Sequence, residues 1–426
     1  MPLRSLKELD PSQGTVKLHT SGSNKHVLLH PQPNALDPND PLRWPRWKKH
    51  LAFGSVCGFT FFTNYGIGGL APAFYTLSLQ FNKTQTETSE LLLWPVFTLG
   101  VFNFFWVPMA NYFGKRPIFV FANLLLAVCF LWGALAQSFK SLLWSNIIAA
   151  FAGSSTEAVG AATVNDLYFL HERGNYMAWY MNAINGGNTI GPLICGFVVE
   201  SLGWRWHKWI AFILAAVKWV VVLLFLPETS YANRALEQSS DLPSASTATA
   251  AAATYSGDSL TEKDDAEIDD EPIYEPGQRL PKKSYLQNLA LWNPLPKTSL
   301  PLLFIRPLPL IVYPAVIFSF LGYAVSLAWV VAINILNSFV LQAPPYNFSP
   351  SINGLINIAG LIGNLAGAFL GGWVVDKYSD WRSKKNAGVF QPETRLHLLV
   401  IPGLVVPAGC LAFGFGVART LHWTAL

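Results

Sequence analysis

Three ionisable side chains lie in or at the end of long apolar stretches of this 426-residue chain. They are Glu157, Lys218 and Asp166. A charged group in a membrane interior is costly, so such residues usually belong to ion or proton pathways. A carboxyl group in a low-dielectric site also binds a proton more readily than one in water. These three residues are therefore the candidates for proton-coupled chemistry.

Each candidate also has a structural interpretation. Glu157 either loads and releases a proton or is a structural carboxyl, hydrogen-bonded among the hydroxyls of Ser154–Thr156. Lys218 lies in mid-segment and needs a carboxylate partner, for which Glu157 is one candidate, or a water-filled cavity; a snorkelling structural lysine is the other interpretation. Asp166 falls at the end of its segment, where contact with a loop or a helix end is favoured over contact with a substrate.

Uncharged polar side chains in the same segments form the candidate substrate cavity. An amide group surrounded by lipid is costly unless it faces protein or water. The residues are Asn64 and Tyr65, Asn182 and Asn185, and Asn334 and Asn337. The last two pairs are each spaced by about one helical turn, so their members share a helix face. Hydrogen bonding between helices is the alternative role for all six.

Membrane-spanning helices must position these residues. The composition is 51% hydrophobic and 13% charged, whereas a soluble protein carries roughly 25% charged residues. Apolar runs long enough to cross a bilayer predict about nine spans, near residues 51–73, 91–111, 117–137, 142–165, 178–199, 208–226, 309–336, 352–375 and 396–417. The predicted fold class is an all-α polytopic membrane protein.

Basic residues predict the orientation, because Lys and Arg favour the cytosolic side of a membrane. They cluster before the first span, between the second and third, and between the eighth and ninth, which all fall on one side. The N-terminus is therefore expected in the cytosol. Arg205 and Lys208 are exceptions at the outer edge of the sixth span. The glycosylation candidates Asn82 and Asn347 fall in loops predicted to face outward.

Polar segments divide the chain into four parts. Residues 1–49 are predicted to form a cytosolic tail, and residues 50–228 a complete bundle of six helices. Residues 229–300 are polar and locally acidic, so we expect a disordered cytosolic linker that cannot bury enough apolar area to offset its ordering entropy. Residues 301–426 are predicted to form a partial second bundle of three helices.

Short motifs in the predicted loops and in the fifth span carry a family resemblance. They comprise Gly114, Lys115 and Arg116 after the second span, Gly187, Gly191, Pro192 and Gly196 in the fifth, and Asp376 and Lys377 after the eighth. In this order they resemble the loop motifs and the fifth-helix antiporter motif of the major facilitator superfamily, in particular its fungal drug:proton antiporters. The resemblance covers nearly everything from Asp37 to the end. It implies two six-helix bundles with the substrate between them, and loop motifs that hold one access state.

Two motifs depart from the family pattern. Asn111 and Tyr112 replace an Asp and an Arg of the first loop motif, so the resemblance places more of the contact between bundles on the second loop. Asn146 stands where the fourth-helix motif carries an Arg that is linked to proton coupling in the family. The resemblance therefore supplies no coupling residue at that position.

These observations predict a secondary active transporter of a small organic molecule, working by proton-coupled efflux and alternating access. The expected location is the plasma membrane, and the expected partners are the substrate, protons and the lipid bilayer. The sequence indicates no cofactor, metal or nucleic acid and leaves the oligomeric state open. No Gly-rich phosphate cradle is present, and the eight histidines form no ligand pair at metal spacing. An enzyme is therefore not expected.

The alternative function follows from the number of spans. The chain stops after the ninth predicted span, where the resemblance implies three further helices. Without them the seventh helix would lack neighbours and the cavity would lose one wall. The alternative is therefore a truncated, transport-impaired member of the family, or a membrane protein that does not transport.

Overall fold

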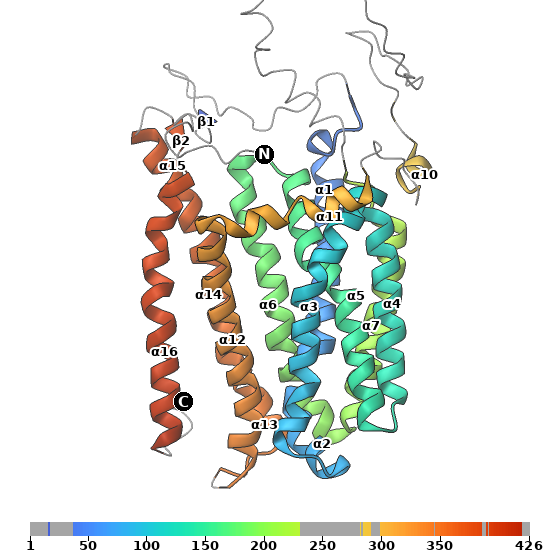
Figure 1. The fold of residues 1–426 in the computed structure, drawn as a ribbon, viewed down its shortest axis with the longest axis vertical. Helices are drawn as coiled ribbons and strands as arrows, with labels where there is room; N and C mark the ends of the chain where they lie inside the picture. Colours follow the sequence, from blue (N-terminus) through green and yellow to red (C-terminus); the bar gives the residue numbers. More distant parts are fainter. Residues whose placement is uncertain are drawn as a thin grey trace, which may run out of the picture.

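A computed structural model gives the structure of the chain, and it describes residues 16–17, 37–230, 282, 284–290, 299–344, 346–385, 389–390 and 392–419. Most of the predicted tail and of the predicted linker lies outside these residues. Within them, the long helices run side by side along the longest axis of the molecule (Figure 1).

Six long helices form the N-terminal bundle. They are α1 (Arg46–Gly68), α3 (Gln85–Phe113), α4 (Lys115–Leu135), α5 (Phe139–Leu167), α6 (Leu170–Ser201) and α7 (Trp204–Phe225). The short η1 (Pro41–Arg43) precedes α1, and η2 (Ala71–Ala73) and α2 (Phe74–Phe81) connect α1 to α3. A capping box formed by Thr84 and Glu87 starts α3, and the left-handed backbone of Gly114 and Gly203 (φ 97° and 88°) makes the turns before α4 and α7.

The second part of the chain is less regular. Its helical elements are α10 (Tyr285–Asn288), α11 (Leu300–Ile305), η3 (Leu308–Val312), α12 (Pro314–Gln342), α13 (Pro350–Leu355), α14 (Asn357–Phe369), a π-helical turn η4 (Leu370–Val374), α15 (Val375–Lys385), η5 (Pro392–Leu399) and α16 (Val400–Ala418). The strands β1 (Val16–Lys17) and β2 (Val389–Phe390) pair antiparallel.

Seven of the described helical segments are long and apolar enough to cross a membrane: Gln85–Phe113, Lys115–Leu135, Phe139–Leu167, Trp204–Phe225, Pro314–Gln342, Pro350–Ser383 and Leu396–Ala418. The predicted spans 51–73 and 178–199 fall largely in α1 and α6, which are 23 and 32 residues long but more polar. The all-α membrane fold is therefore confirmed, whereas the count of nine spans stays a prediction.

Prolines shift one predicted boundary. The prediction placed a span at 309–336, but α12 starts at Pro314 and continues to Gln342. Residues 300–312 instead form α11 and η3, which lie across one end of the bundle (Figure 1). Pro307, Pro309 and Pro314 explain the error, because proline lacks the N–H that a continuous helix needs while apolarity continues through it.

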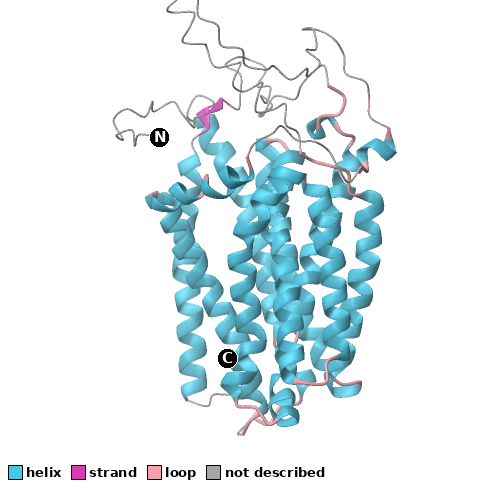
Figure 2. Ribbon diagram, turned by 45° about the vertical axis from the view of Figure 1, so that its right-hand side comes forward, coloured by secondary structure: helices cyan, strands magenta, loops and turns pink. Residues whose placement is uncertain are grey.

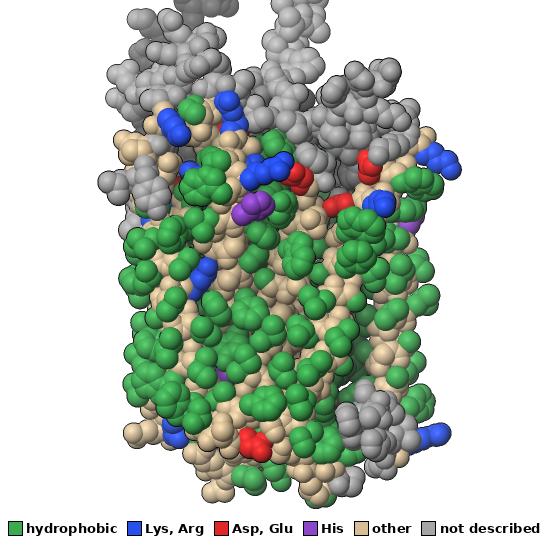
Figure 3. All heavy atoms as spheres, turned by 180° about the vertical axis from the view of Figure 1, so that it is seen from behind, with side chains coloured by type: hydrophobic (Ala, Val, Ile, Leu, Met, Phe, Trp, Pro, Cys, Tyr) green, Lys and Arg blue, Asp and Glu red, His purple; other side chains and the backbone are tan. Residues whose placement is uncertain are grey.

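Small residues let the helices of the first bundle approach closely. Ala52, Ala122, Ala149, Ala211 and Ala215 are fully buried where α1, α4, α5 and α7 meet. Large apolar side chains instead cover the outer surface (Figure 3), as expected for a surface that meets lipid.

The bundle has two ends, which we name by their elements. The α2 end carries the turns between α2 and α3 and between α12 and α13, and the α15 end carries α15 itself and the turn after α3 (Figures 1 and 2). Asn82 and Asn347, the two glycosylation candidates, both lie in turns of the α2 end with left-handed backbone (φ 49°). Whether they carry glycans stays a prediction.

Candidate functional site

A cavity of about 280 Å³, which we call the central cavity, lies between the N-terminal bundle and α12. Polar lining residues come from five helices: Asn64 of α1, Asn103 of α3, Glu157 of α5, Asn185 and Asn188 of α6, and Tyr323 and Asn334 of α12. Apolar residues such as Phe320, Leu327 and Val331 complete the α12 side. A mostly apolar cavity with a few convergent polar groups is typical of a small-molecule site.

Glu157 has the only carboxyl or amino side chain among the residues that line this cavity. Asn103 donates from Nδ2 to its Oε2 at 3.3 Å and also to the backbone oxygen of Leu99 at 2.9 Å. The hydroxyls of Ser154–Thr156 instead donate to backbone oxygens three residues earlier, at 2.7–2.9 Å. None of these three hydroxyls donates to Glu157, so the contacts do not support the interpretation of Glu157 as a carboxyl held by them.

The six predicted cavity residues divide into three groups. Asn64, Asn185 and Asn334 line the central cavity, whereas Asn182 lines a second cavity together with Asn185. Tyr65 is buried away from both cavities, with its ring 4.9 Å from the ring of His207. Asn337 lines neither of them. A role in substrate binding stays a prediction for all six.

Sequence reasoning missed Asn103 and Asn188 of the central cavity. Both lie in predicted spans, and the rule that buried amides must face protein or water applies to them as well. Their presence inside apolar runs was the signal that could have found them.

Lys218 does not meet Glu157. Its side chain is buried between α7 and α1, with Nζ 3.0 Å from the position that a Cβ on Gly58 would occupy. It does not line the central cavity, and among the described residues it forms no ion pair. The hypothesis that these two residues pair with each other is therefore not supported by the contacts.

Asp166 lies at the α15 end and forms an ion pair with Lys115. This contact joins the end of α5 to the start of α4, as expected for a residue at a helix end. Arg116 donates from Nε to the oxygen of Leu226 at 2.7 Å and from Nη2 to that of Leu223 at 2.8 Å. The first loop motif therefore holds helices of one bundle together.

Glu228 is a further residue whose contact with the first loop motif sequence reasoning missed. Its carboxylate accepts the backbone N–H groups of Lys115 and Arg116 at 3.1 Å, and those of Thr229 and Ser230 at 3.0 and 2.9 Å. It therefore caps the N-terminus of α4, where a negative charge is favoured. A Cβ on Gly114 would lie 2.6 Å from this carboxylate, so the position requires glycine.

Removing this cap is expected to destabilise the protein. We expect Glu228→Ala to cost about 2 kcal/mol and Glu228→Gln about 1 kcal/mol, because alanine removes both acceptor oxygens, whereas glutamine keeps one acceptor oxygen and loses the other together with the charge. Thermal unfolding of the purified protein measures both. Glu90→Gln, which removes a carboxylate of α3 away from any helix cap, is the control. Equal melting temperatures for all variants would contradict the capping role.

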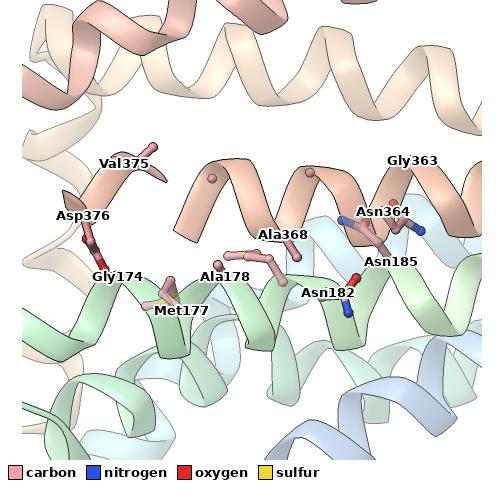
Figure 4. A pocket seen from close by; sticks show the side chains of 13 residues that line it. Gly174, Met177, Ala178, Asn182, Asn185, Gly363, Asn364, Ala368, Val375 and Asp376 are labelled. Carbon is pink, nitrogen blue, oxygen red and sulfur yellow. The ribbon is translucent and has the colours of Figure 1, made fainter. Parts of the chain in front are cut away.

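The second loop motif meets the start of α6. The Asp376 carboxylate lies against Gly174, in the first turns of α6 (Figure 4). Gly372 packs on Ala178. The positive end of the α6 dipole favours a carboxylate there. Lys377 instead places Nζ 4.4 Å from the ring of Trp373. The second cavity, about 460 Å³, lies along this contact between α6 and α14.

The contact predicts the effect of a single methyl group. We expect Gly174→Ala to displace the Asp376 carboxylate, because the new Cβ would collide with it, and so to separate α6 from α15. The labelling rate of a cysteine introduced at Met181, in the second cavity, should then rise several-fold. Gly367→Ala is the control, since a Cβ there has nothing within 4 Å. An equal rate in both variants would contradict the prediction.

The glycines of the fifth-helix motif face two partners. Gly187 and Gly191 pack on α1, where a Cβ on Gly191 would lie 2.9 Å from the Cα of Gly69. Gly196 packs on the backbone of Pro350 and Gly354 in α13. Pro192 lies inside α6, which continues through it. The motif therefore holds α6 against both parts of the chain.

The α2 end is closed by contacts between these parts. Ser351 donates its backbone N–H to the Glu200 carboxylate at 3.2 Å, and hydrogen bonds from the Ser351 side chain and backbone hold the pKa of Glu200 below its ordinary value. Gln342 donates from Nε2 to the oxygen of Pro72 at 2.9 Å.

The structure corrects the expectation for the basic residues of the sixth span. Arg205 donates to the oxygen of Ala136 at 3.2 Å near the bundle surface. Lys208 is completely buried, because the turn at Gly203 starts α7 early enough to carry it into the bundle. It is therefore an interior cation and not a charge at the membrane edge.

Comparison with known proteins identifies a family whose model matches most of the chain. The family model described as Major Facilitator Superfamily matches residues 55–426. An uncharacterized MFS-type transporter of Schizosaccharomyces pombe is 24% identical over 93% of this chain and 72% of its own length. Protein HOL1 of Saccharomyces cerevisiae is 25% identical over 94% and 75%, and the MFS-type transporter atr4 of Stereocaulon alpinum is 25% identical over 91% and 64%.

Solved structures with a likeness to the chain include transporters. The human organic anion transporter MFSD10 (TETRAN) matches 77% of this chain and 72% of its own, at 17% identity and a TM-score of 0.43. The proton:xylose symporter XylE matches 46% of this chain and 48% of its own, at 15% identity and a TM-score of 0.39.

Proposed function

Because the chain belongs to the Major Facilitator Superfamily, we propose that it exports a small organic cation across the plasma membrane in exchange for protons, by alternating access. Membership of this family, with transporter relatives, makes the chain a secondary transporter and not an enzyme. The substrate class, the proton coupling and the direction are the proposal.

The observation that carries the proposal is Glu157, the only carboxylate in the lining of the central cavity. Its described hydrogen-bond donor, Asn103, is neutral. A carboxylate in a low-dielectric site needs a compensating positive charge, and either a proton or a cationic substrate supplies one. The rings of Phe320 and Tyr323 line the same cavity and offer faces that attract a cation.

Exchange follows if the proton and the substrate compete for this carboxylate. A bound proton neutralises Glu157 and removes the attraction for a cation, and a bound cation keeps the proton away. The transporter then carries one or the other in each half-cycle, so a proton gradient drives the cation the opposite way. The amides of Asn64, Asn185 and Asn334 remain to hydrogen-bond the substrate's polar groups.

The proposed orientation places the α15 end in the cytosol and the α2 end outside. Basic residues of the second–third and eighth–ninth loops lie at the α15 end, including Lys115, Arg116 and Lys377, in agreement with the preference of Lys and Arg for the cytosolic side. Alternating access then opens the contacts of Asp376 on one side and those of Gly196 and Gln342 on the other.

A reconstituted transport assay tests the proposal. The purified full chain is placed in liposomes, and a pH gradient is imposed with a quaternary ammonium ion, a diamine, a carboxylic acid or a neutral sugar of similar size present. We expect a cation to move against the proton gradient while the internal pH changes in step. Preferential movement of the acid or the sugar would refute the cation assignment. Failure of every compound to move would favour the alternative, a transport-impaired member; truncation after the ninth span stays a prediction.

A further inference from the structure

Lys208 is a buried cation outside the central cavity. Its Nζ donates to the backbone oxygen of Gly66 and to Oδ1 of Asn146, both at 2.7 Å, and lies 5.4 Å from the centre of the Phe130 ring. The residue has no solvent-exposed surface. Among the described residues no carboxylate forms an ion pair with it. Its charge must therefore be compensated in another way.

The end of α1 supplies that compensation. Gly66 is among the last four residues of α1, and the last four carbonyls of a helix lack partners within it. The same end carries the negative part of the helix dipole, which favours a cation. A Cβ on Gly66 would collide with the Phe130 ring, so glycine at this position lets that ring pack against the end of the helix. Lys208 therefore acts as a cap that comes from α7.

The capped end of α1 leads directly to a contact between the two parts of the chain. After Gly69 the chain enters η2, and the oxygen of Pro72 in η2 accepts the hydrogen bond from Gln342 at the end of α12. The ring of His207, next to Lys208, packs on Tyr65 and lies 2.8 Å from the Cβ position of Gly69. Residues 207 and 208 thus hold both sides of this turn.

This contact lies beyond the central cavity on its α2 side. Asn64 and Gly68 of α1 and Asn334 of α12 line the cavity, and Pro72 and Gln342 follow further toward the α2 end. The hydrogen bond between Pro72 and Gln342 therefore joins the α1 wall and the α12 wall of the central cavity on its α2 side. An opening of the cavity toward the α2 end would have to break this bond. Its geometry depends on where the end of α1 is held.

We propose that Lys208 is a positioning residue for closure of the α2 end: its ammonium holds the end of α1 and η2 where Gln342 can bind Pro72. Without the ammonium, the end of α1 moves more freely and the α2 end opens more often. The inference rests on the proposed function only in that the α2 end opens and closes.

A distance measurement tests this directly. Spin labels are attached to cysteines introduced at Leu79 in α2 and Ile352 in α13, both exposed at the α2 end, after the four native cysteines are replaced by alanine. Pulsed electron–electron double resonance on the full chain then measures the distribution of distances between the two labels, which gives the closed and open populations. In Lys208→Met we expect the ratio of closed to open to fall about tenfold, the factor that corresponds to one hydrogen bond to a charged group. Lys208→Arg should restore most of the closed population.

Matched variants separate positioning from general damage. Lys140→Met removes an exposed lysine of α5 at the same end and should leave the distances unchanged. Gln342→Leu should open the end by itself, and the double variant with Lys208→Met should open it no further, because both act through one contact. Wild-type distances in a folded Lys208→Met protein, or additive effects in the double variant, would overturn the proposal.

A folding failure of Lys208→Met does not end the test. Asn146→Leu removes only one of the two acceptors and keeps the bond to Gly66. It should give a smaller shift toward the open population, and no shift would overturn the proposal. These readouts need no substrate and no proton gradient. They therefore stand or fall separately from the assignment of a cationic substrate.

Discussion

Glu157→Gln is expected to abolish proton-driven exchange while leaving the protein folded. Glutamine keeps the shape and can still pair with Asn103, but it neither binds a proton nor compensates a cation. We expect the rate of cation movement driven by a pH gradient to fall by about a hundredfold or more, since the lost charge interaction in a low-dielectric site is worth several kcal/mol. Liposomes with an imposed gradient measure it.

The control for this substitution is Glu87→Gln. Glu87 is an exposed carboxylate of α3, in an ion pair with Lys83 at 2.8 Å, away from the cavity. Its loss should weaken the cap of α3 but leave the pH dependence of exchange intact. Proton-coupled exchange at the wild-type rate in Glu157→Gln would remove this residue from the mechanism. It would leave the closure role of Lys208 untouched.

Alanine at Gly187 or Gly191 is expected to stop transport through packing alone. A Cβ at Gly187 would collide with the backbone oxygen of Phe61, and one at Gly191 would lie within 3.0 Å of the backbone of α1. Backbone cannot turn aside as a side chain can, so α1 and α6 must separate. Overpacking of this kind costs about 1–3 kcal/mol. We expect exchange to fall more than about tenfold, because α1 and α6 both line the cavity.

Gly186→Ala is the matched control on the same helix. A Cβ there meets only the ring of Phe61 at 3.5 Å, an ordinary contact. Transport and melting temperature should stay close to the wild type. Equal losses at positions 186, 187 and 191 would mean that helix propensity matters and the close approach to α1 does not.

Local properties of the chain were enough to predict the class of the molecule. Apolar run length predicts helices that cross a membrane, and the order of short motifs predicts the family. Glu157 could be singled out because a carboxyl in an apolar run is unusual wherever it points. Asp166 could be placed at a helix end because it directly follows the apolar run 142–165. Each of these inferences needs only neighbours in the sequence.

Tertiary structure alone decided which side chains share a space. Lys218 and Lys208 lie ten residues apart in one helix, yet the first packs on Gly58 and the second caps the end of α1 at Gly66. Glu228 meets the start of α4 from more than a hundred residues away. Hydropathy and spacing describe one helix at a time, whereas these contacts depend on how each helix is rotated and paired in the bundle. The sequence by itself therefore determined that the chain is a membrane protein of this family and that each buried charge is energetically costly. The packing of the helices decided which groups surround each of these charges.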